Sequence, residues 1–169
     1  MEDKKTEGQK LQERLSYNSI NIWNKISGDE RKKLDDFCNG YKLFLDRAKT
    51  EREYVAEARK EAEKYGFVSF DELVKKDEKL SPGTKVYKII RNKAMILSVI
   101  GKRPIEEGVN IIGGHIDAPR IDLKQNPLYE DSEMGLMKTH YYGGIKKYQW
   151  VAIPLALHGV VIKADGTVV

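Results

Sequence analysis

Apolar positions in the first half of the chain follow a helical spacing. Between residues 34 and 62 they recur at intervals of three, four or seven, which places one apolar stripe along a helix. The spacing predicts one long helix, ended by Gly66, whose core face packs on a sheet. An earlier helix is expected over residues 9–26. The capping-box spacing of Ser69 and Glu72 predicts a short helix that starts there.

From Ser81 onward the pattern becomes that of strands. The runs 85–90 and 94–100 are rich in β-formers and flank a short turn, which predicts a hairpin. Further strands are expected over 109–114, 120–124, 138–142, 151–157 and 159–163. Asn126-Pro127 is expected to end the strand over 120–124, and Asp165-Gly166 to turn the chain into a returning strand.

Composition narrows the class of protein. The chain has 169 residues, enough for one domain with a sizeable core. Its apolar runs fall short of the roughly 20 residues needed to cross a bilayer, and the first ten residues lack the apolar stretch of a secretory signal. The single cysteine, Cys38, excludes an internal disulfide framework. A cytoplasmic protein without a membrane partner is therefore expected.

The net charge of +4 is weak as a signal for nucleic acid. The excess of basic side chains lies in residues 81–169 and is scattered along them. The densest stretch, Lys146-Lys147-Tyr148-Gln149-Trp150, fits either a basic binding surface with aromatic platforms or an ordinary solvated strand edge. Composition favours the solvated edge, so no nucleic-acid partner is expected.

Candidate chemistry concentrates around one histidine. The predicted strand over 109–114 is apolar, ends in two glycines and delivers His115 at its end. His115 and Asp117 are two residues apart, so both point to one face if the strand continues. Imidazole is a common zinc ligand, and a neighbouring carboxylate can fix the orientation of its ring. By spacing alone, a hydrogen-bonded pair with a structural role explains the same residues.

The other candidate side chains have weaker patterns. His140 and His158 lack an acidic neighbour at ligand spacing, which favours structural roles. Asp122 alternates with apolar neighbours and is expected to face solvent. Glu130, Asp131 and Glu133 form an acidic cluster that a solvated loop explains.

Two motifs resemble one known family. The stretch from Ile111 to Pro119 resembles the first metal-ligand motif of the M18 metalloaminopeptidases, the aspartyl-aminopeptidase-like family, usually written His-Thr-Asp-Ser-Pro. Here Ile116 and Ala118 replace the threonine and serine. The stretch Tyr141–Ile145 followed by Trp150 is similar to the Tyr-Gly-Gly-Gly-Ile-Trp stretch of that family, with one glycine fewer and a later tryptophan. The motifs come in the family's order.

The resemblance implies an α/β fold. Family members have a zinc-peptidase-type domain, with N-terminal helices packed on a mixed sheet, interrupted by an inserted β-rich oligomerisation domain. On this chain, residues 1–124 would be the N-terminal part of the catalytic domain, and residues 125–169 the incomplete start of the inserted domain. Members remove N-terminal residues from peptides with two divalent metals, usually zinc, and form large homo-oligomers.

The resemblance also assigns roles to the two candidate residues. His115 would be a ligand of one zinc ion, and Asp117 the carboxylate of the active site that clamps His115. The remaining ligands and the glutamate base match nothing in these 169 residues. We therefore expect the chain to be an incomplete N-terminal portion that is inactive alone. The alternative is a non-catalytic assembly or regulatory fragment that uses the surface near residues 143–169.

Overall fold

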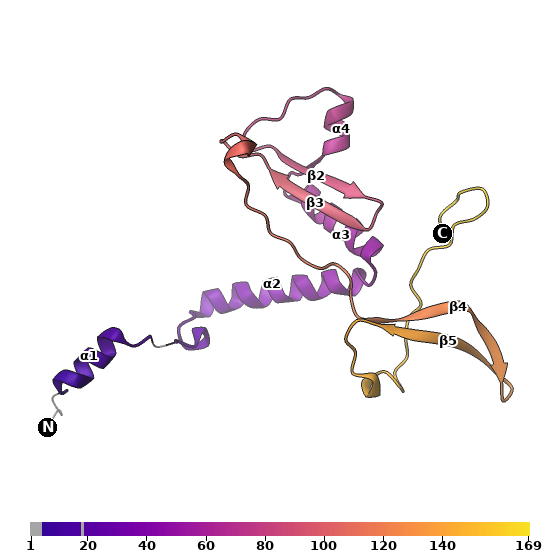
Figure 1. The fold of residues 1–169 in the computed structure, drawn as a ribbon, viewed down its shortest axis with the longest axis horizontal. Helices are drawn as coiled ribbons and strands as arrows, with labels where there is room; N and C mark the ends of the chain where they lie inside the picture. Colours follow the sequence, from indigo (N-terminus) through magenta and orange to yellow (C-terminus); the bar gives the residue numbers. More distant parts are fainter. Residues whose placement is uncertain (1–4, 18) are drawn as a thin grey trace. The chain divides into compact units, whose positions relative to one another are not determined.

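The computed structural model describes residues 5–17 and 19–169, and the chain divides between Tyr41 and Lys42 into two compact units. The first unit holds α1 (Glu7–Leu15), the 3-10 turn η1 (Ile22–Asn24) and the beginning of α2 (Gly28–Arg47) (Figure 1). The predicted single helix over 9–26 is wrong. Ser16 is extended, and the Asn21 side chain accepts the Trp23 amide to start a separate turn, a competition typical of asparagine.

The predicted long helix over 34–62 is also wrong, because the chain forms two helices there. Helix α2 ends at Arg47 and α3 (Glu51–Lys64) begins after Thr50. Thr50 and Glu53 form a capping box: the hydroxyl accepts the Glu53 amide at 3.3 Å, and the carboxylate accepts the Thr50 amide at 2.9 Å. Gly66, with φ of +80°, ends the helix as predicted.

The first sheet has three strands in the order β1 (Val68–Ser69), β2 (Lys85–Ile90) and β3 (Ala94–Val99). Strand β1 runs parallel to β2, and β3 antiparallel, so the sheet is mixed. The predicted hairpin is confirmed, and Arg91 and Asn92 both take positive φ in its turn. Helix α4 (Phe70–Lys75) begins where predicted, although the Ser69 side chain makes no capping hydrogen bond.

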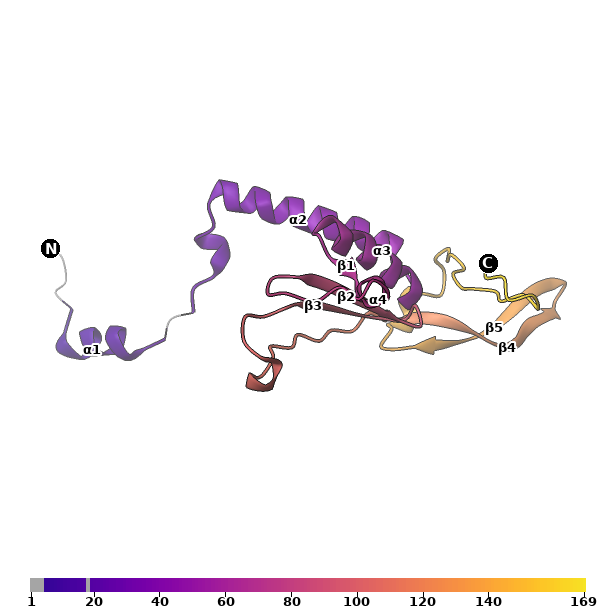
Figure 2. The same cartoon turned by 90° about the horizontal axis from the view of Figure 1, so that it is seen from above.

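Helix α3 packs on this mixed sheet, as Figure 2 shows. The Tyr87 hydroxyl of β2 donates to Glu63 of α3 at 2.8 Å, and Lys85 donates to the Tyr65 carbonyl at 2.9 Å. Five apolar side chains are buried among the described residues: Ala48, Val55, Ala62, Val86 and Tyr87. The expected α/β architecture, with helix on mixed sheet, is confirmed, and its core lies between α3 and β2.

The second sheet is a hairpin of β4 (Arg120–Asp131) and β5 (Met134–Tyr142). The predicted strand end at Asn126-Pro127 is wrong. Asn126 takes a φ of +50° within a register shift between Leu123 and Leu128, and β4 then continues. Four residues of β4 (124–127) stand opposite one residue of β5 (138) in this irregularity, which absorbs the extra residues without ending the pairing. The remaining 3-10 turns are η2 (Ile105–Glu107) and η3 (Lys147–Gln149).

Three predicted strands do not form. Over residues 159–163 the structure has only the isolated bridge residue Ile162. Residues 109–114 and 151–157 are irregular, and within the part of the chain that the structure describes neither pairs with a strand. Ile112 is fully exposed, so the apolar run is not a buried strand here. The predicted final turn is present: Ile162 bridges Val168 in antiparallel sense. Across residues 5–17 and 19–169, the structure has no helix with the length and apolarity of a membrane span.

The Thr50 cap offers a direct test of why α2 and α3 are separate helices. Thr50→Ala is expected to lower the free energy of unfolding of the second unit by about 1 kcal/mol, because one amide at the start of α3 loses its acceptor. Urea denaturation followed by circular dichroism measures this. Thr6→Ala removes the same kind of capping box from α1, in the other unit, and is the matched control. Equal midpoints for Thr50→Ala and the unsubstituted chain would contradict the capping role.

Candidate functional site

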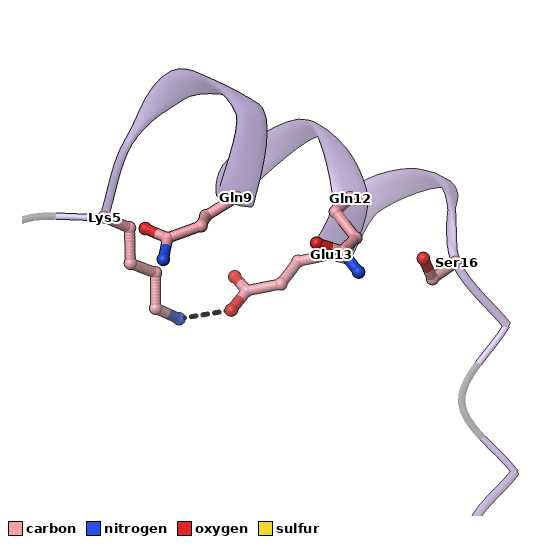
Figure 3. Close-up of a pocket in the computed structure, with 5 residues that line it drawn as sticks. All are labelled: Lys5, Gln9, Gln12, Glu13 and Ser16. Carbon is pink, nitrogen blue, oxygen red and sulfur yellow. Dashed lines mark hydrogen bonds and ion pairs between the residues drawn. The ribbon is translucent and has the colours of Figure 1, made fainter.

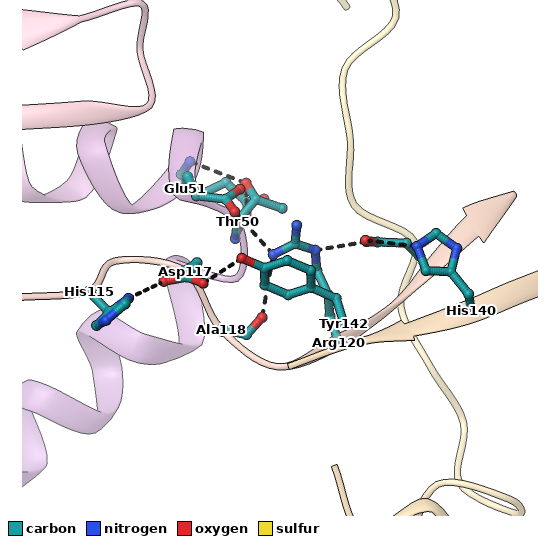
Figure 4. A network of polar contacts seen from close by, with 10 residues as sticks. Thr50, Glu51, His115, Asp117, Ala118, Arg120, His140 and Tyr142 are labelled. Carbon is teal, nitrogen blue, oxygen red and sulfur yellow. Dashed lines mark hydrogen bonds and ion pairs between the residues drawn. The ribbon is translucent and has the colours of Figure 1, made fainter. Parts of the chain in front are cut away.

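His115 lies on an irregular segment that leads into β4. Its ring nitrogen Nδ1 is 3.1 Å from Asp117 Oδ1, and its side chain is 95% exposed (Figure 4). The prediction that both side chains meet is confirmed by this contact, although no strand places them. An ionised Asp117 accepts a hydrogen bond from a protonated Nδ1. In that tautomer the lone pair of Nε2 is free to bind a metal.

Asp117 is held from its other side by a residue far along the sequence. The Tyr142 hydroxyl, at the end of β5, donates to Asp117 Oδ2 at 2.7 Å. The hydrogen bond from Tyr142, and then that from His115, lower the pKa of Asp117 below its ordinary value of 3.8. The same bond raises the pKa of Tyr142. Asp117 is therefore a carboxylate at neutral pH, as the contact with His115 requires.

Arg120 contacts both Tyr142 and helix α3. Its Nε donates to Asp122 at 2.8 Å, and its Nη1 donates to Glu51, in the first turn of α3, at 3.0 Å. The guanidinium carbon also lies 4.1 Å from the centre of the Tyr142 ring. Hydrogen bonding to Asp122 is the main reason that the pKa of Arg120 is raised. The expectation that Asp122 simply faces solvent is therefore wrong, because it anchors Arg120.

A close backbone approach joins the two predicted motifs. Gly143 has a φ of +73°, and a Cβ built on it would lie 3.4–3.5 Å from atoms of Pro119. Pro119 belongs to the histidine motif, and Gly143 to the glycine-containing stretch that follows Tyr142. The left-handed backbone favours glycine here, and the distances to Pro119 show that the two residues pack in ordinary contact. The two motifs are thus in contact, as neighbouring parts of one site.

His158 contacts the N-terminus of α3, the helix end that Arg120 also contacts. His158 Nδ1 is 2.8 Å from Glu53 Oε1, in the capping box of α3. Burial alone would raise the pKa of Glu53, but hydrogen bonds from His158 and Thr50 outweigh it and hold that pKa below 4.5. His140 Nε2 lies 3.9 Å from Asp122. These contacts are consistent with the structural roles expected for both histidines.

The donor set fits one position of a zinc site. His115 presents one imidazole whose other nitrogen is held by a carboxylate, the usual arrangement of a zinc-bound histidine. Among the described residues, no group of three or more histidine, cysteine, aspartate or glutamate side chains could hold a metal. Zinc in a catalytic site has about three protein ligands. Within the described residues, the surroundings of His115 fit one ligand position of such a site, and no cluster of three donors completes it.

The sequence does not single out Arg120 or Glu51, and Tyr142 stands in it only as part of a motif. The contact of Tyr142 with Asp117 depends on the register of β4 and β5, and the contact of Arg120 with Glu51 depends on how β4 meets α3. The one available signal was that Tyr142 directly precedes the glycine pair.

The hollow on α1 shown in Figure 3 is not part of the site around His115. It is a polar groove along one helix, and its Lys5 and Glu13 pair with each other at 2.6 Å.

Comparison with known proteins gives consistent matches. A family model described as aminopeptidase I zinc metalloprotease (M18) matches residues 44–168. A curated relative from Clostridium acetobutylicum, a probable M18 family aminopeptidase 1, is 50% identical over 149 residues, which cover 88% of this chain and 32% of the relative. A relative of the same name from Thermotoga maritima is 40% identical over 147 residues, 87% of this chain and 31% of the relative.

Solved structures agree with these sequence matches. The crystal structure of aminopeptidase I from Borrelia burgdorferi B31 superposes with a TM-score of 0.80 at 41% identity, covering 89% of this chain and 36% of that one. Aminopeptidase I from Clostridium acetobutylicum gives 0.76 at 48% identity, with 92% and 34% coverage. The class that these matches define is that of the zinc metalloproteases. Within it, the chain belongs to the M18 family, and it spans about a third of the length of the curated relatives it matches.

Proposed function

We propose that this chain contributes part of the active site of an aminopeptidase that removes N-terminal residues from peptides. The observation that carries the proposal is the pair of His115 and Asp117, at 3.1 Å, inside the region that the M18 family model matches. His115 would bind zinc through Nε2. Asp117 would accept a hydrogen bond from Nδ1 and keep the ring in place, and the Tyr142 hydroxyl would hold the pKa of Asp117 further below its ordinary value.

The bound metal would polarise the peptide carbonyl and supply an activated water. Two zinc ions per complete site, or other divalent ions in their place, belong to the proposal. Because the described residues provide one ligand, the remaining ligands and the general base would come from polypeptide equivalent to the rest of the relatives. The 169-residue chain alone would bind zinc weakly and would not hydrolyse peptides.

Residues 125–169 support a second candidate role, in assembly. Beyond residue 124, Val151, Leu155 and Leu157 expose large apolar side chains. Exposed apolar side chains along one segment are typical of an interface. We propose that residues 1–124 belong to the catalytic domain and residues 125–169 to an inserted domain that joins subunits of a cytoplasmic homo-oligomer. A non-catalytic assembly fragment is the alternative.

A complementation assay tests the proposal. The chain is mixed with the part of the Clostridium acetobutylicum relative that lies outside the 149 matched residues. Zinc is added, and release of N-terminal residues from a panel of peptides is measured. We expect activity from the mixture and from the complete relative, but from neither part alone, and we expect a chelator to abolish it. Turnover by the 169-residue chain alone would contradict the proposal, and stable association without turnover would favour the assembly fragment.

A further inference from the structure

The two carboxylate oxygens of Asp117 have two different partners. Oδ1 faces His115 Nδ1 at 3.1 Å, and Oδ2 accepts the Tyr142 hydroxyl at 2.7 Å. Asp117 lies on a segment outside the β-ladders, so no strand pairing fixes its backbone. A carboxylate with one partner can turn about its side-chain bonds, whereas one bonded at both oxygens is fixed in direction.

Tyr142, in contrast, belongs to the paired strand β5. It pairs across the hairpin with Arg120, whose guanidinium covers the Tyr142 ring at 4.1 Å. Arg120 is itself only partly exposed and is held by Asp122 and Glu51. The position of the Tyr142 hydroxyl is therefore supported by the β4–β5 register and by this ion-pair network, in addition to its bond to Asp117 (Figure 4).

We infer that Tyr142 is a positioning residue for the metal ligand: its hydroxyl fixes the Asp117 carboxylate, and the carboxylate in turn fixes the ring orientation and tautomer of His115. The inference rests on the proposed function, because the tautomer of His115 matters for metal binding through Nε2. The inference also assigns a structural role to the second sequence motif. Tyr142 supports Asp117, and Gly143 beside it takes the left-handed backbone that brings the chain against Pro119.

The tautomer of His115 is a direct readout that needs no metal. Which imidazole nitrogen carries the proton is set by the hydrogen bond that this ring makes. With Asp117 held in place, Nδ1 carries the hydrogen. When Asp117 is free to turn, the ring returns toward the tautomer of a solvated histidine, with the hydrogen on Nε2. That form has no lone pair on Nε2 for a metal.

The experiment is long-range proton–nitrogen NMR of the histidine-labelled 169-residue chain at about pH 8.5, well above the ordinary imidazole pKa of about 6.5. The chain has three histidines, so His140 and His158 are internal reporters of folding. We expect His115 to be mostly Nδ1-protonated in the unsubstituted chain. Tyr142→Phe, which keeps the ring beneath Arg120, is expected to shift His115 to mostly Nε2-protonated.

Tyr141→Phe is the matched control, because it removes a hydroxyl from the adjacent residue, whose ring contacts Lys147 instead. It is expected to leave the His115 tautomer unchanged. Two results would overturn the inference: a tautomer that Tyr142→Phe does not alter, or an equal shift in both variants. Because no zinc is present, such a failure is distinct from failure of the complementation assay.

A second measurement covers the case in which Tyr142→Phe disturbs folding, seen as altered His140 and His158 signals. In the unsubstituted chain with carbon-labelled tyrosine rings, the Tyr142 ring signals are followed as the pH is raised. The hydrogen bond to Asp117 raises the pKa of the Tyr142 hydroxyl above its ordinary value. Asp117→Asn is expected to move the ionisation of Tyr142 to lower pH. Ionisation of Tyr142 at the same pH in both chains would overturn the inference on its own.

Discussion

Replacing His115 with alanine is expected to lower kcat/KM of the reconstituted aminopeptidase by more than about 100-fold. Loss of a residue that merely supports a metal ligand typically costs 10–100-fold, and loss of the ligand itself should cost more. The physical reason is that zinc would lose one of about three protein ligands, and with it both its affinity for the site and its fixed position. The measurement is the complementation assay at saturating complement, together with the zinc content of the purified mixture.

Two further variants make this result specific. Asp117→Asn should fall within the 10–100-fold range, because the ring keeps its nitrogen but loses the carboxylate that orients it. His158→Gln changes a histidine that contacts Glu53, and it is expected to alter kcat/KM only a few-fold. If His115→Ala and His158→Gln lowered activity equally, His115 would have no special role and the proposed zinc ligand would be wrong.

Val55→Asp is expected to unfold the second unit. Val55 is 2% exposed and lies on α3, whose buried face covers the mixed sheet. A carboxylate in this place has no partner, and an uncompensated buried charge costs about 3–5 kcal/mol. Because five buried side chains make up the core of the described chain, little stability is left to offset the loss. Loss of cooperative urea unfolding, followed by circular dichroism, measures the effect.

The control for this prediction is an equal charge at an exposed valine. Val74, on α4, is 61% exposed, so Val74→Asp should shift the urea midpoint only slightly. Val55→Ala gives an intermediate test and should cost about 2 kcal/mol for the two carbons removed. If Val55→Asp kept the midpoint of the unsubstituted chain, the packing of α3 on β2 would be wrong.

The sequence predicts those elements whose signals are local. The β2–β3 hairpin is confirmed because two β-rich runs and their turn are adjacent, and the end of α3 at Gly66 is confirmed because glycine there takes a left-handed backbone. The break between α2 and α3 was also readable, since Thr50 and Glu53 have capping-box spacing. The apolar stripe continues in sequence across this break, and for that reason its spacing alone predicts one helix.

The sequence is less informative where structure depends on distant partners. Residues 109–114 have strong β-propensity, but a strand also needs a neighbour to accept its backbone hydrogen bonds, and the described chain offers none. The site follows the same rule. The contact of His115 with Asp117 is local and was predicted, whereas the contact of Tyr142 with Asp117 spans 25 residues and depends on the register of the hairpin.

The β4–β5 hairpin also separates what must be kept from what is free to vary. Arg120 and Tyr142 pair at its base, beside Asp117, whereas Asp131 and Met134 pair at its tip. Side chains alternate between faces along a strand, so removing or adding residues in matched pairs near the tip keeps the register at the base. Hairpin length is thus uncoupled from the geometry around His115. A longer or shorter arm is therefore compatible with the same contacts of Asp117 with His115 and Tyr142.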